Sequence, residues 1–236
     1  MGVNPVDNSG AGRIFPTYGT IEPMQVTVLG ATGRTGLHVV RMLVARGHTV
    51  RAGLRSRGRA EVLRGLGAEP VVADVTADAA DLVEVFTNSD VVISAVGAPD
   101  PEPESVNLVD RDGAIAAIRA AELAGVPRYV QLSAQFADAP DQGDRLVRSI
   151  LLAKQISDSV LRKSALTWTI VRPGTLTDGP ATGRVKAGGH LEPGRISRPD
   201  VAAVLVGALA EPLTENRGFD VVSGDFPVAP ALAALD

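Results

Sequence analysis

The sequence predicts an α/β protein in which a parallel β-sheet is covered by helices on both faces. From residue 24 onward, short apolar segments alternate with stretches of helical periodicity. The apolar segments are hydrophobic at nearly every position, which is typical of strands buried on both sides. A glycine-rich turn joins the first apolar segment directly to the helical stretch that follows it.

The alternation of strands and helices runs through most of the chain. Strands are expected at 25–29, 49–54, 69–73, 90–95, 128–132 and 167–171. Helices are expected at 34–46, 57–66, 78–87, 105–124, 143–163 and 199–210. Because crossovers between parallel strands are right-handed, few topologies remain besides a Rossmann-like, doubly wound sheet.

The chain is expected to consist of one folded domain with a short leader. Residues 1–23 are rich in Gly, Pro and Asn and have no periodicity, so they predict an N-terminal arm or leader. Residues 24–236 predict a single Rossmann domain. Within it, residues 174–197 are rich in Gly and Pro and predict a small excursion on the substrate side of the sheet.

Composition restricts the partners and the compartment. The net charge of −4 offers no general attraction to nucleic acid or to an anionic membrane. Cysteine is absent from the sequence, so disulfides and thiolate metal sites are excluded, and no His/Asp/Glu spacing predicts a metal site. No apolar run approaches the roughly 18 residues that span a bilayer. The sequence therefore predicts a cytoplasmic protein with a small-molecule substrate, as a monomer or a homodimer.

The glycine-rich turn carries the most specific functional signal. It reads Gly30-x-x-Gly33-x-x-Gly36 between the first strand and the first helix. Glycine is needed where the backbone adopts positive φ and where a Cβ would block a phosphate. The helix that follows offers unpaired N–H groups and a partial positive charge to an anion. This arrangement predicts that a dinucleotide pyrophosphate binds at the turn.

The end of the second strand favours NADP over NAD. NAD-binding versions of this motif carry an Asp or Glu there, which accepts hydrogen bonds from the ribose hydroxyls. This chain instead has Arg55, Arg57 and Arg59, with Arg34 inside the glycine turn. Guanidinium groups match a 2′-phosphate well, and Arg55 directly follows the strand. We interpret Arg57 and Arg59 as part of a solvated basic face.

Residues after the third and fourth strands are further candidates for cofactor contact. Asp74 follows the third strand, where its carboxylate is placed either to meet the adenine amino group or to cap the next helix. Ala95, Val96 and Gly97 follow the fourth strand. Small residues there allow a cofactor to lie against the backbone, although Gly97 also suits a simple turn.

Several motifs resemble those of the atypical short-chain dehydrogenases/reductases. They are Gly30-Ala-Thr-Gly-Arg-Thr-Gly36, Asp74-Val-Thr76, Ala124-Gly-Val-Pro-Arg-Tyr-Val-Gln-Leu-Ser133 and Thr169-Ile-Val-Arg-Pro-Gly174. Within that superfamily the chain is most similar to single-domain NAD(P)H-binding proteins akin to biliverdin/flavin reductase and to NmrA-like proteins. The resemblance covers about residues 24–222.

The resemblance implies a role for each matching residue. The pyrophosphate would be held by Gly30, Thr32, Gly33, Arg34, Thr35 and Gly36. Arg55 would bind the 2′-phosphate, and Asp74 and Val75 would flank the adenine. Ser133 would face the nicotinamide from one side, with Pro173 and Gly174 on the other.

One position departs from the family pattern. Typical members carry Tyr-x-x-x-Lys on the helix after the fifth strand, where the lysine binds the nicotinamide ribose and the tyrosine transfers a proton. Here Lys154 matches the lysine, but Ile150 occupies the tyrosine position. Protonation would then come from solvent or through Ser133, so Ser133 and Lys154 are the candidate catalytic residues.

These features leave three functions open. The first is an NADPH-dependent reductase of a flavin, a quinone or another small conjugated acceptor, in which the cofactor carries the difficult step. The second is an NADP(H)-binding redox sensor without turnover, which Ile150 supports. The third, a sugar-nucleotide epimerase or dehydratase, is disfavoured by the absent tyrosine and by the short carboxyl-terminal region.

Overall fold

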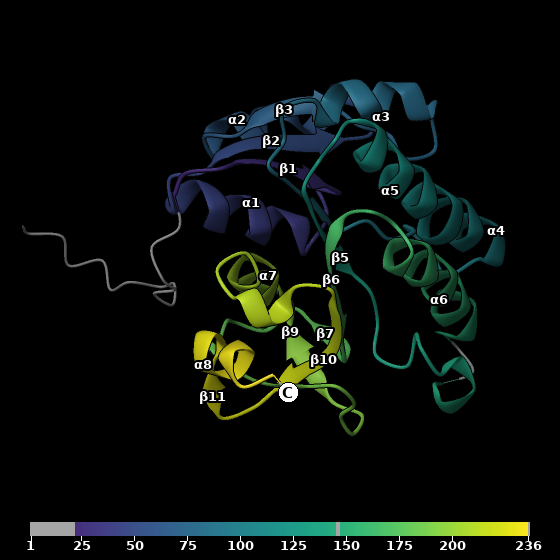
Figure 1. Ribbon diagram of the computed structural model, residues 1–236, viewed down its shortest axis with the longest axis vertical. Coiled ribbons are helices and arrows are strands. Elements are labelled where there is room, and N and C mark those ends of the chain that lie inside the picture. The colour runs from purple at the N-terminus through teal and green to yellow at the C-terminus, as the bar shows by residue number, and fades with distance from the viewer. Residues whose placement is uncertain (1–21, 145–146, 236) are drawn as a thin grey trace, which may run out of the picture.

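A computed structural model of the protein describes residues 22–144 and 147–235, and its centre is a nine-stranded sheet (Figure 1). The strand order is β11-β8-β10-β6-β5-β4-β1-β2-β3. Their bounds are β1 Gln25–Leu29, β2 Thr49–Leu54, β3 Glu69–Val72, β4 Val91–Ser94, β5 Arg128–Leu132, β6 Thr167–Pro173, β8 Arg184–Gly188, β10 Arg217–Ser223 and β11 Phe226–Pro227. The predicted Rossmann-like α/β fold is confirmed.

Most of the sheet is parallel, and its carboxyl ends lie along one edge. β1 to β6 and β10 pair in parallel with their neighbours. β8 runs antiparallel to both β10 and β11. A separate parallel pair joins β7 (Thr175–Thr177) to β9 (Arg195–Ser197). In doubly wound sheets, ligands bind at the carboxyl edge where the strand order reverses, here between β1 and β4.

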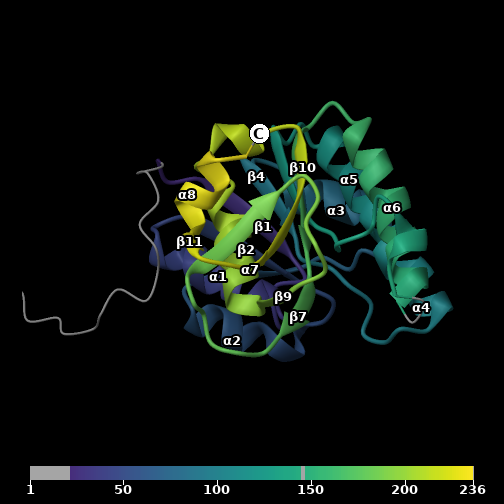
Figure 2. The same cartoon turned by 90° about the horizontal axis from the view of Figure 1, so that it is seen from below.

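Helices cover both faces of the sheet (Figures 1 and 2). One face carries α1 Gly36–Ala45, α2 Ala60–Gly65, α7 Arg198–Gly207 and α8 Val228–Ala233. The other face carries α3 Ala79–Phe86, α4 Pro103–Val106, α5 Ala114–Leu123 and α6 Arg148–Arg162. A π-helical segment, η2 (Asn107–Gly113), joins α4 to α5, and short 3₁₀ turns lie at η1 Arg57–Arg59, η3 Pro140–Gln142 and η5 Pro212–Thr214.

Each face of the sheet has its own hydrophobic core. On the α1 and α7 side, small β-branched and aliphatic residues such as Val39, Leu43 and Val204 fill the interior. On the α3 and α5 side, Phe86 and Ile118 are fully buried. Because aromatic residues make up only 3% of the chain, the helices pack on the sheet mainly through Val, Ala and Leu.

Two regions differ from the sequence-based expectation. The excursion at 174–197 supplies β8 to the main sheet, so its Gly/Pro-rich composition hides a true strand. The expected helix at 105–124 is divided by the π-helical segment η2, at whose end an added Cβ on Gly113 would lie 2.6 Å from Val75 Cγ2. The expected leader, 1–23, lies almost wholly outside the described residues. Within residues 22–144 and 147–235, no helix is long and apolar enough to cross a bilayer.

Truncating a core side chain tests the α3 side of the sheet. Phe86 is fully buried, so Phe86→Ala is expected to lower the free energy of unfolding by roughly 3–5 kcal/mol. The measurement is urea-induced unfolding. Leu123→Ala is the control, since Leu123 is 76% exposed and its loss is expected to cost about 0.5 kcal/mol or less. Equal effects of the two substitutions would contradict this core.

Candidate functional site

The glycine turn after β1 is so tightly packed that side chains are excluded. Gly30 has φ of +69°, and a Cβ there would lie 2.7 Å from the carbonyl oxygen of Ala95. A Cβ on Gly36 would overlap the carbonyl oxygen of Gly30. The turn therefore lies directly against the backbone that leaves β4, and glycine at positions 30 and 36 is a steric requirement.

The first turn of α1 is open to an anion. α1 has no side-chain cap, and no acidic residue lies in its first turn. The carbonyl oxygen of Gly33 accepts from the N–H of Leu37 at 3.0 Å, so helical bonding begins inside the glycine turn. Thr35, at the N-cap position, is buried. Uncapped N–H groups beside a turn that has glycine at positions 30, 33 and 36 match the needs of a pyrophosphate, so these residues fit a dinucleotide.

The arginines after β2 divide into two roles. Arg59 donates from Nη1 to the carbonyl oxygen of Thr32 at 2.8 Å, which ties η1 to the glycine turn. Arg59 is also exposed, as its interpretation as part of a solvated basic face requires. Arg55 and Arg57 are exposed, and neither has an ion-pair partner among the described residues.

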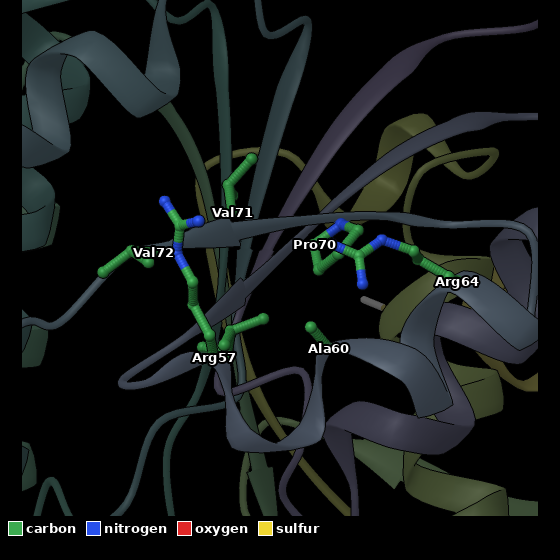
Figure 3. A pocket seen from close by; sticks show the side chains of 7 residues that line it. Arg57, Ala60, Arg64, Pro70, Val71 and Val72 are labelled. Atoms are coloured by element: carbon green, nitrogen blue, oxygen red, sulfur yellow. The ribbon is translucent and has the colours of Figure 1, made fainter.

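A cavity of about 310 Å³ opens beside these arginines. It lies between α2 and β3 and is lined by Leu54, Arg57, Ala60, Arg64, Pro70, Val71 and Val72. Figure 3 shows the Arg57 guanidinium near Val71 and Val72, and the Arg64 guanidinium near Pro70. Leu54 lines the cavity and is the last residue of β2, so Arg55, the next residue, lies at the edge of the cavity.

Asp74 and Val75 lie at the carboxyl end of β3. Asp74 Oδ1 accepts hydrogen bonds from the backbone N–H of Thr76 at 2.9 Å and from its hydroxyl at 2.8 Å. The alternative in which Asp74 caps the following helix is wrong, because Asp78 caps α3 by accepting from the N–H of Ala80. Val75 is buried against Gly113 of η2.

Lys154 forms a buried ion pair that the sequence did not reveal. Its Nζ lies 2.9 Å from Asp110 Oδ1, and both side chains are buried. The same Nζ donates to the carbonyl oxygen of Val96 at 3.1 Å, and Asp110 Oδ2 accepts from the N–H of Ala98 at 2.8 Å. The segment after β4, which includes Ala95, Val96 and Gly97, is thereby held between α6 and η2.

Ser133, directly after β5, donates to a second buried carboxyl group. Its Oγ lies 2.7 Å from Asp158 Oδ2. Gln131 Nε2 donates to the other oxygen, Oδ1, at 2.6 Å. Burial raises the pKa of Asp158, opposed by the hydrogen bonds from Ser133 and Gln131. Asp158 lies one helical turn after Lys154, so α6 directs both side chains toward the carboxyl ends of the strands.

No tyrosine in the described residues is placed to act as the family acid. Ile150 is half-buried on α6 at the family tyrosine position. Tyr129 is fully buried in β5, and burial raises its pKa. Tyr18 lies outside the described residues.

The excursion is fixed to the sheet next to Pro173 and Gly174. A Cβ on Gly174 would overlap the carbonyl oxygen of Gly194, so the two segments touch through backbone. Arg172, just before Pro173, forms ion pairs with Asp220 at 2.8 Å and with Asp138, and donates to the carbonyl oxygen of Gly189 at 2.6 Å. This buried network holds residues 189–194 beside the carboxyl edge.

A surface ion pair joins the glycine turn to the excursion. Arg34 Nη1 lies 2.9 Å from Asp178, and Arg198 Nη1 lies 2.6 Å from the other oxygen of the same carboxylate. Arg34 and Asp178 are largely exposed, so the pair itself contributes little stability.

In residues 22–144 and 147–235, no group of three or more His, Cys, Asp or Glu side chains is placed to hold a metal ion.

Fold and site together define a dinucleotide-binding protein, and comparison with known proteins agrees. The profile of the NAD(P)H-binding family matches residues 30–212, so the chain belongs to this family. The predicted resemblance to atypical short-chain dehydrogenases/reductases is confirmed. The family is of oxidoreductase type, and its cofactor is a nicotinamide dinucleotide.

Individual relatives match over nearly their whole length. The chain is 36% identical over 214 residues to the uncharacterized sugar epimerase YhfK of Bacillus subtilis, covering 90% of this chain and 100% of YhfK. A solved structure from Bacillus halodurans, named a putative NAD-dependent epimerase/dehydratase, is 34% identical with a TM-score of 0.82, covering 89% and 98%. The anaerobillin reductase ChuY of Escherichia coli O157:H7 shares the fold at 23% identity, with a TM-score of 0.72 and coverage of 86% and 98%.

The glycine turn yields a direct prediction about cofactor binding. Gly36→Ala places a methyl group against the carbonyl oxygen of Gly30, so the turn must open. We expect NADPH affinity to fall by about tenfold or more, which corresponds to about 1.4 kcal/mol. Fluorescence titration of NADPH measures it. Gly65→Ala is the matched control, because a Cβ there meets no atom within 4 Å. Unchanged affinity in Gly36→Ala would contradict the steric argument.

Proposed function

We propose that the protein is an NADPH-dependent reductase of a small conjugated acceptor such as a flavin, a quinone or a tetrapyrrole. The observation that carries the proposal is the composition of the carboxyl edge. The glycine turn follows β1 and Ser133 follows β5 at the same carboxyl edge, and Lys154 bonds to the segment after β4, while the position of the usual proton-donating tyrosine holds Ile150. An acceptor that needs no tyrosine acid suits this set of residues.

The proposed cofactor is NADPH, held along the carboxyl edge of β1 to β5. The glycine turn from Gly30 to Gly36 would bind the pyrophosphate, and Arg55 would bind the 2′-phosphate. Support for the phosphate comes from the exposed Arg55 and Arg57, which have no carboxylate partner in the part of the chain that the structure describes. No acidic residue stands between Leu54 and Ala60, where an NAD-binding protein needs one.

The bound cofactor supplies a hydride, and the protein supplies position and electrostatics. Lys154 is held rigidly by Asp110 and by the carbonyl oxygen of Val96, so its ammonium group has one fixed place near the segment after β4. Pro173 and Gly174 would border the nicotinamide on the side away from Ser133. Because Arg172 anchors residues 189–194, the substrate side of the site is preformed.

The names of two similar proteins point to different activities, and Ile150 decides between them in this proposal. ChuY, which shares the fold, is named an anaerobillin reductase. YhfK is named a sugar epimerase, and epimerisation through transient oxidation requires a residue that removes a hydroxyl proton and returns it. Ile150 provides no such group, so the reductase is our first proposal.

A second candidate is a redox sensor that binds NADP(H) without turnover. Ile150 favours it, because the substitution removes an acid while leaving the cofactor-binding residues intact. In this alternative the exposed ion pairs between Arg34, Asp178 and Arg198 would pass the cofactor state to the excursion.

Steady-state assays separate the two candidates. Purified protein is mixed with NADPH and, in turn, with flavins, quinones and linear tetrapyrroles. We expect NADPH oxidation well above background with at least one acceptor. The oxidation is measured as the loss of absorbance of the reduced nicotinamide. Tight NADPH binding with background oxidation for every acceptor would overturn the reductase and favour the sensor.

The cofactor preference is tested at Arg55. Arg55→Ala is expected to lower NADPH affinity by about tenfold or more, since a charge-assisted hydrogen bond contributes roughly 1.5–3 kcal/mol, and to leave NADH affinity unchanged. Titration of each nucleotide measures the ratio. Arg119→Ala, which removes an exposed arginine of α5 on the other side of the sheet, is the control and is expected to change neither affinity. A parallel loss for NADPH and NADH would remove the 2′-phosphate assignment.

A further inference from the structure

A fully buried carboxyl group lies directly behind Ser133. Asp158 is 1% exposed, its Oδ1 accepts a hydrogen bond from Gln131 Nε2 at 2.6 Å, and its Oδ2 lies 2.7 Å from Ser133 Oγ. Ser133 donates to the ionised carboxylate, whereas the protonated carboxyl group donates to Ser133. Ser133 is 6% exposed, so it is the member of this group that a ligand at the carboxyl end of β5 reaches. Asp158 is therefore connected to the site through a single hydroxyl.

No cation forms an ion pair with Asp158 among the residues that the structure describes. The ammonium group of Lys154, one turn earlier on α6, pairs with Asp110 instead. Burial without a paired cation favours the neutral carboxylic acid. Burial accordingly raises the pKa of Asp158, while the hydrogen bonds from Ser133 and Gln131 and the charges of Lys154 and Arg162 act in the opposite direction.

The surroundings of Asp158 contain few other charged groups. Its own helix contributes Lys154 and Arg162, and β5 contributes the uncharged Ser133 and Gln131. The other elements packed on α6 carry charges that are paired or exposed. In η2, Asp110 pairs with Lys154 and Arg111 pairs with Asp112. Arg172 of β6 pairs with Asp138 and Asp220, and Asp141 of η3 pairs with Arg148. Glu104 of α4 and Arg119 and Glu122 of α5 are exposed.

The position of Asp158 on α6 relates it to the absent tyrosine. Residues 150, 154 and 158 are spaced by four, so Ile150, Lys154 and Asp158 lie along one side of the helix. The family acid would stand at the first of these positions. In this chain the first position is apolar, and a protonatable group stands at the third, joined to Ser133.

We propose that Asp158 is the proton source for the reduction, acting through the hydroxyl of Ser133. The proposal rests on the proposed reductase function and names the group that supplies its proton. Asp158 touches no substrate, so it is a positioning and proton-supplying residue, whereas Ser133 is the group that meets the acceptor.

The step balances in protons and electrons. The acceptor gains a hydride from the reduced nicotinamide, which is thereby oxidised, and a proton from Ser133 Oγ. Ser133 takes the proton of the Asp158 carboxyl group in the same relay, which leaves Asp158 as a carboxylate. Gln131 Nε2 and the Ser133 hydroxyl both donate to that carboxylate and stabilise it. After the product leaves, a proton returns from water through Ser133.

Infrared spectroscopy tests the protonation state without relying on activity. At pH 7 the wild-type protein is expected to show the carbonyl stretch of a protonated carboxyl group, and Asp158→Asn is expected to lack it. Ser133→Ala should keep the band at a shifted frequency, because the carboxyl group loses one hydrogen-bond partner. Absence of the band from the wild-type protein would overturn the proposal whatever the enzyme's activity.

Kinetics test the relay. Asp158→Asn keeps the shape and the bond with Gln131, so NADPH affinity is expected to stay unchanged while quinone reduction falls about 100-fold. The wild-type rate should decrease as rising pH ionises Asp158, and this decrease should vanish in Asp158→Asn. Ser133→Ala removes the hydroxyl of the relay and is expected to lower quinone reduction by the same factor as Asp158→Asn. Because Ser133 follows β5, this variant still tests the relay if Asp158→Asn folds poorly. Ser164→Ala is the control and should be fully active, because the half-buried hydroxyl of Ser164, just after α6, bonds only to backbone groups.

The outcomes distinguish the relay from the function on which it rests. If the wild-type protein reduces an acceptor and Asp158→Asn reduces it equally fast with the same pH profile, the relay is wrong and the reductase stands. If the wild-type protein binds NADPH but reduces no acceptor, the reductase is wrong and the relay falls with it.

Discussion

The close backbone approach at the glycine turn determines the geometry of the whole site. Gly36 leaves no room between α1 and the turn, and Gly30 leaves none between the turn and the segment after β4. The N-terminus of α1 therefore points at the carboxyl edge between β1 and β4, where the strand order reverses. Because α7 packs on α1, this contact also positions the start of α7, whose Arg198 binds Asp178.

The fold was largely predictable because most strands are uniformly apolar and separated by long helices. In the carboxyl-terminal part the helix at 199–210 was predicted and corresponds to α7, but β8, β10 and β11 were not predicted. In β10 the apolar residues Phe219 and Val221 flank Asp220, and a buried aspartate in a strand is tolerated only because Arg172 of β6 pairs with it. Such a pairing joins positions far apart in the sequence. The π-helical segment η2 was also missed, because the apolar periodicity of 105–124 does not distinguish it from an α-helix.

At the site, Ser133 and Lys154 were predicted as site residues, but their carboxylate partners were not. A usable signal was present in both helices. Asp110 is spaced by four from the buried Val106 and Ala114, and Asp158 follows the buried Lys154 by four and precedes the buried Leu161 by three. A charged residue on the buried face of a helix requires a hydrogen-bond or ion-pair partner. Periodicity shows that a partner exists, whereas only the packing of α6 against η2 and β5 shows which residue it is.

The two edges of the sheet share a property that bears on how the protein behaves at high concentration. β3 contains Pro70 and β11 ends at Pro227, so each outermost strand lacks one backbone N–H donor and is short. A short edge strand that contains proline is a poor template for an incoming strand from another molecule. Both outermost strands of the sheet therefore disfavour pairing between native molecules.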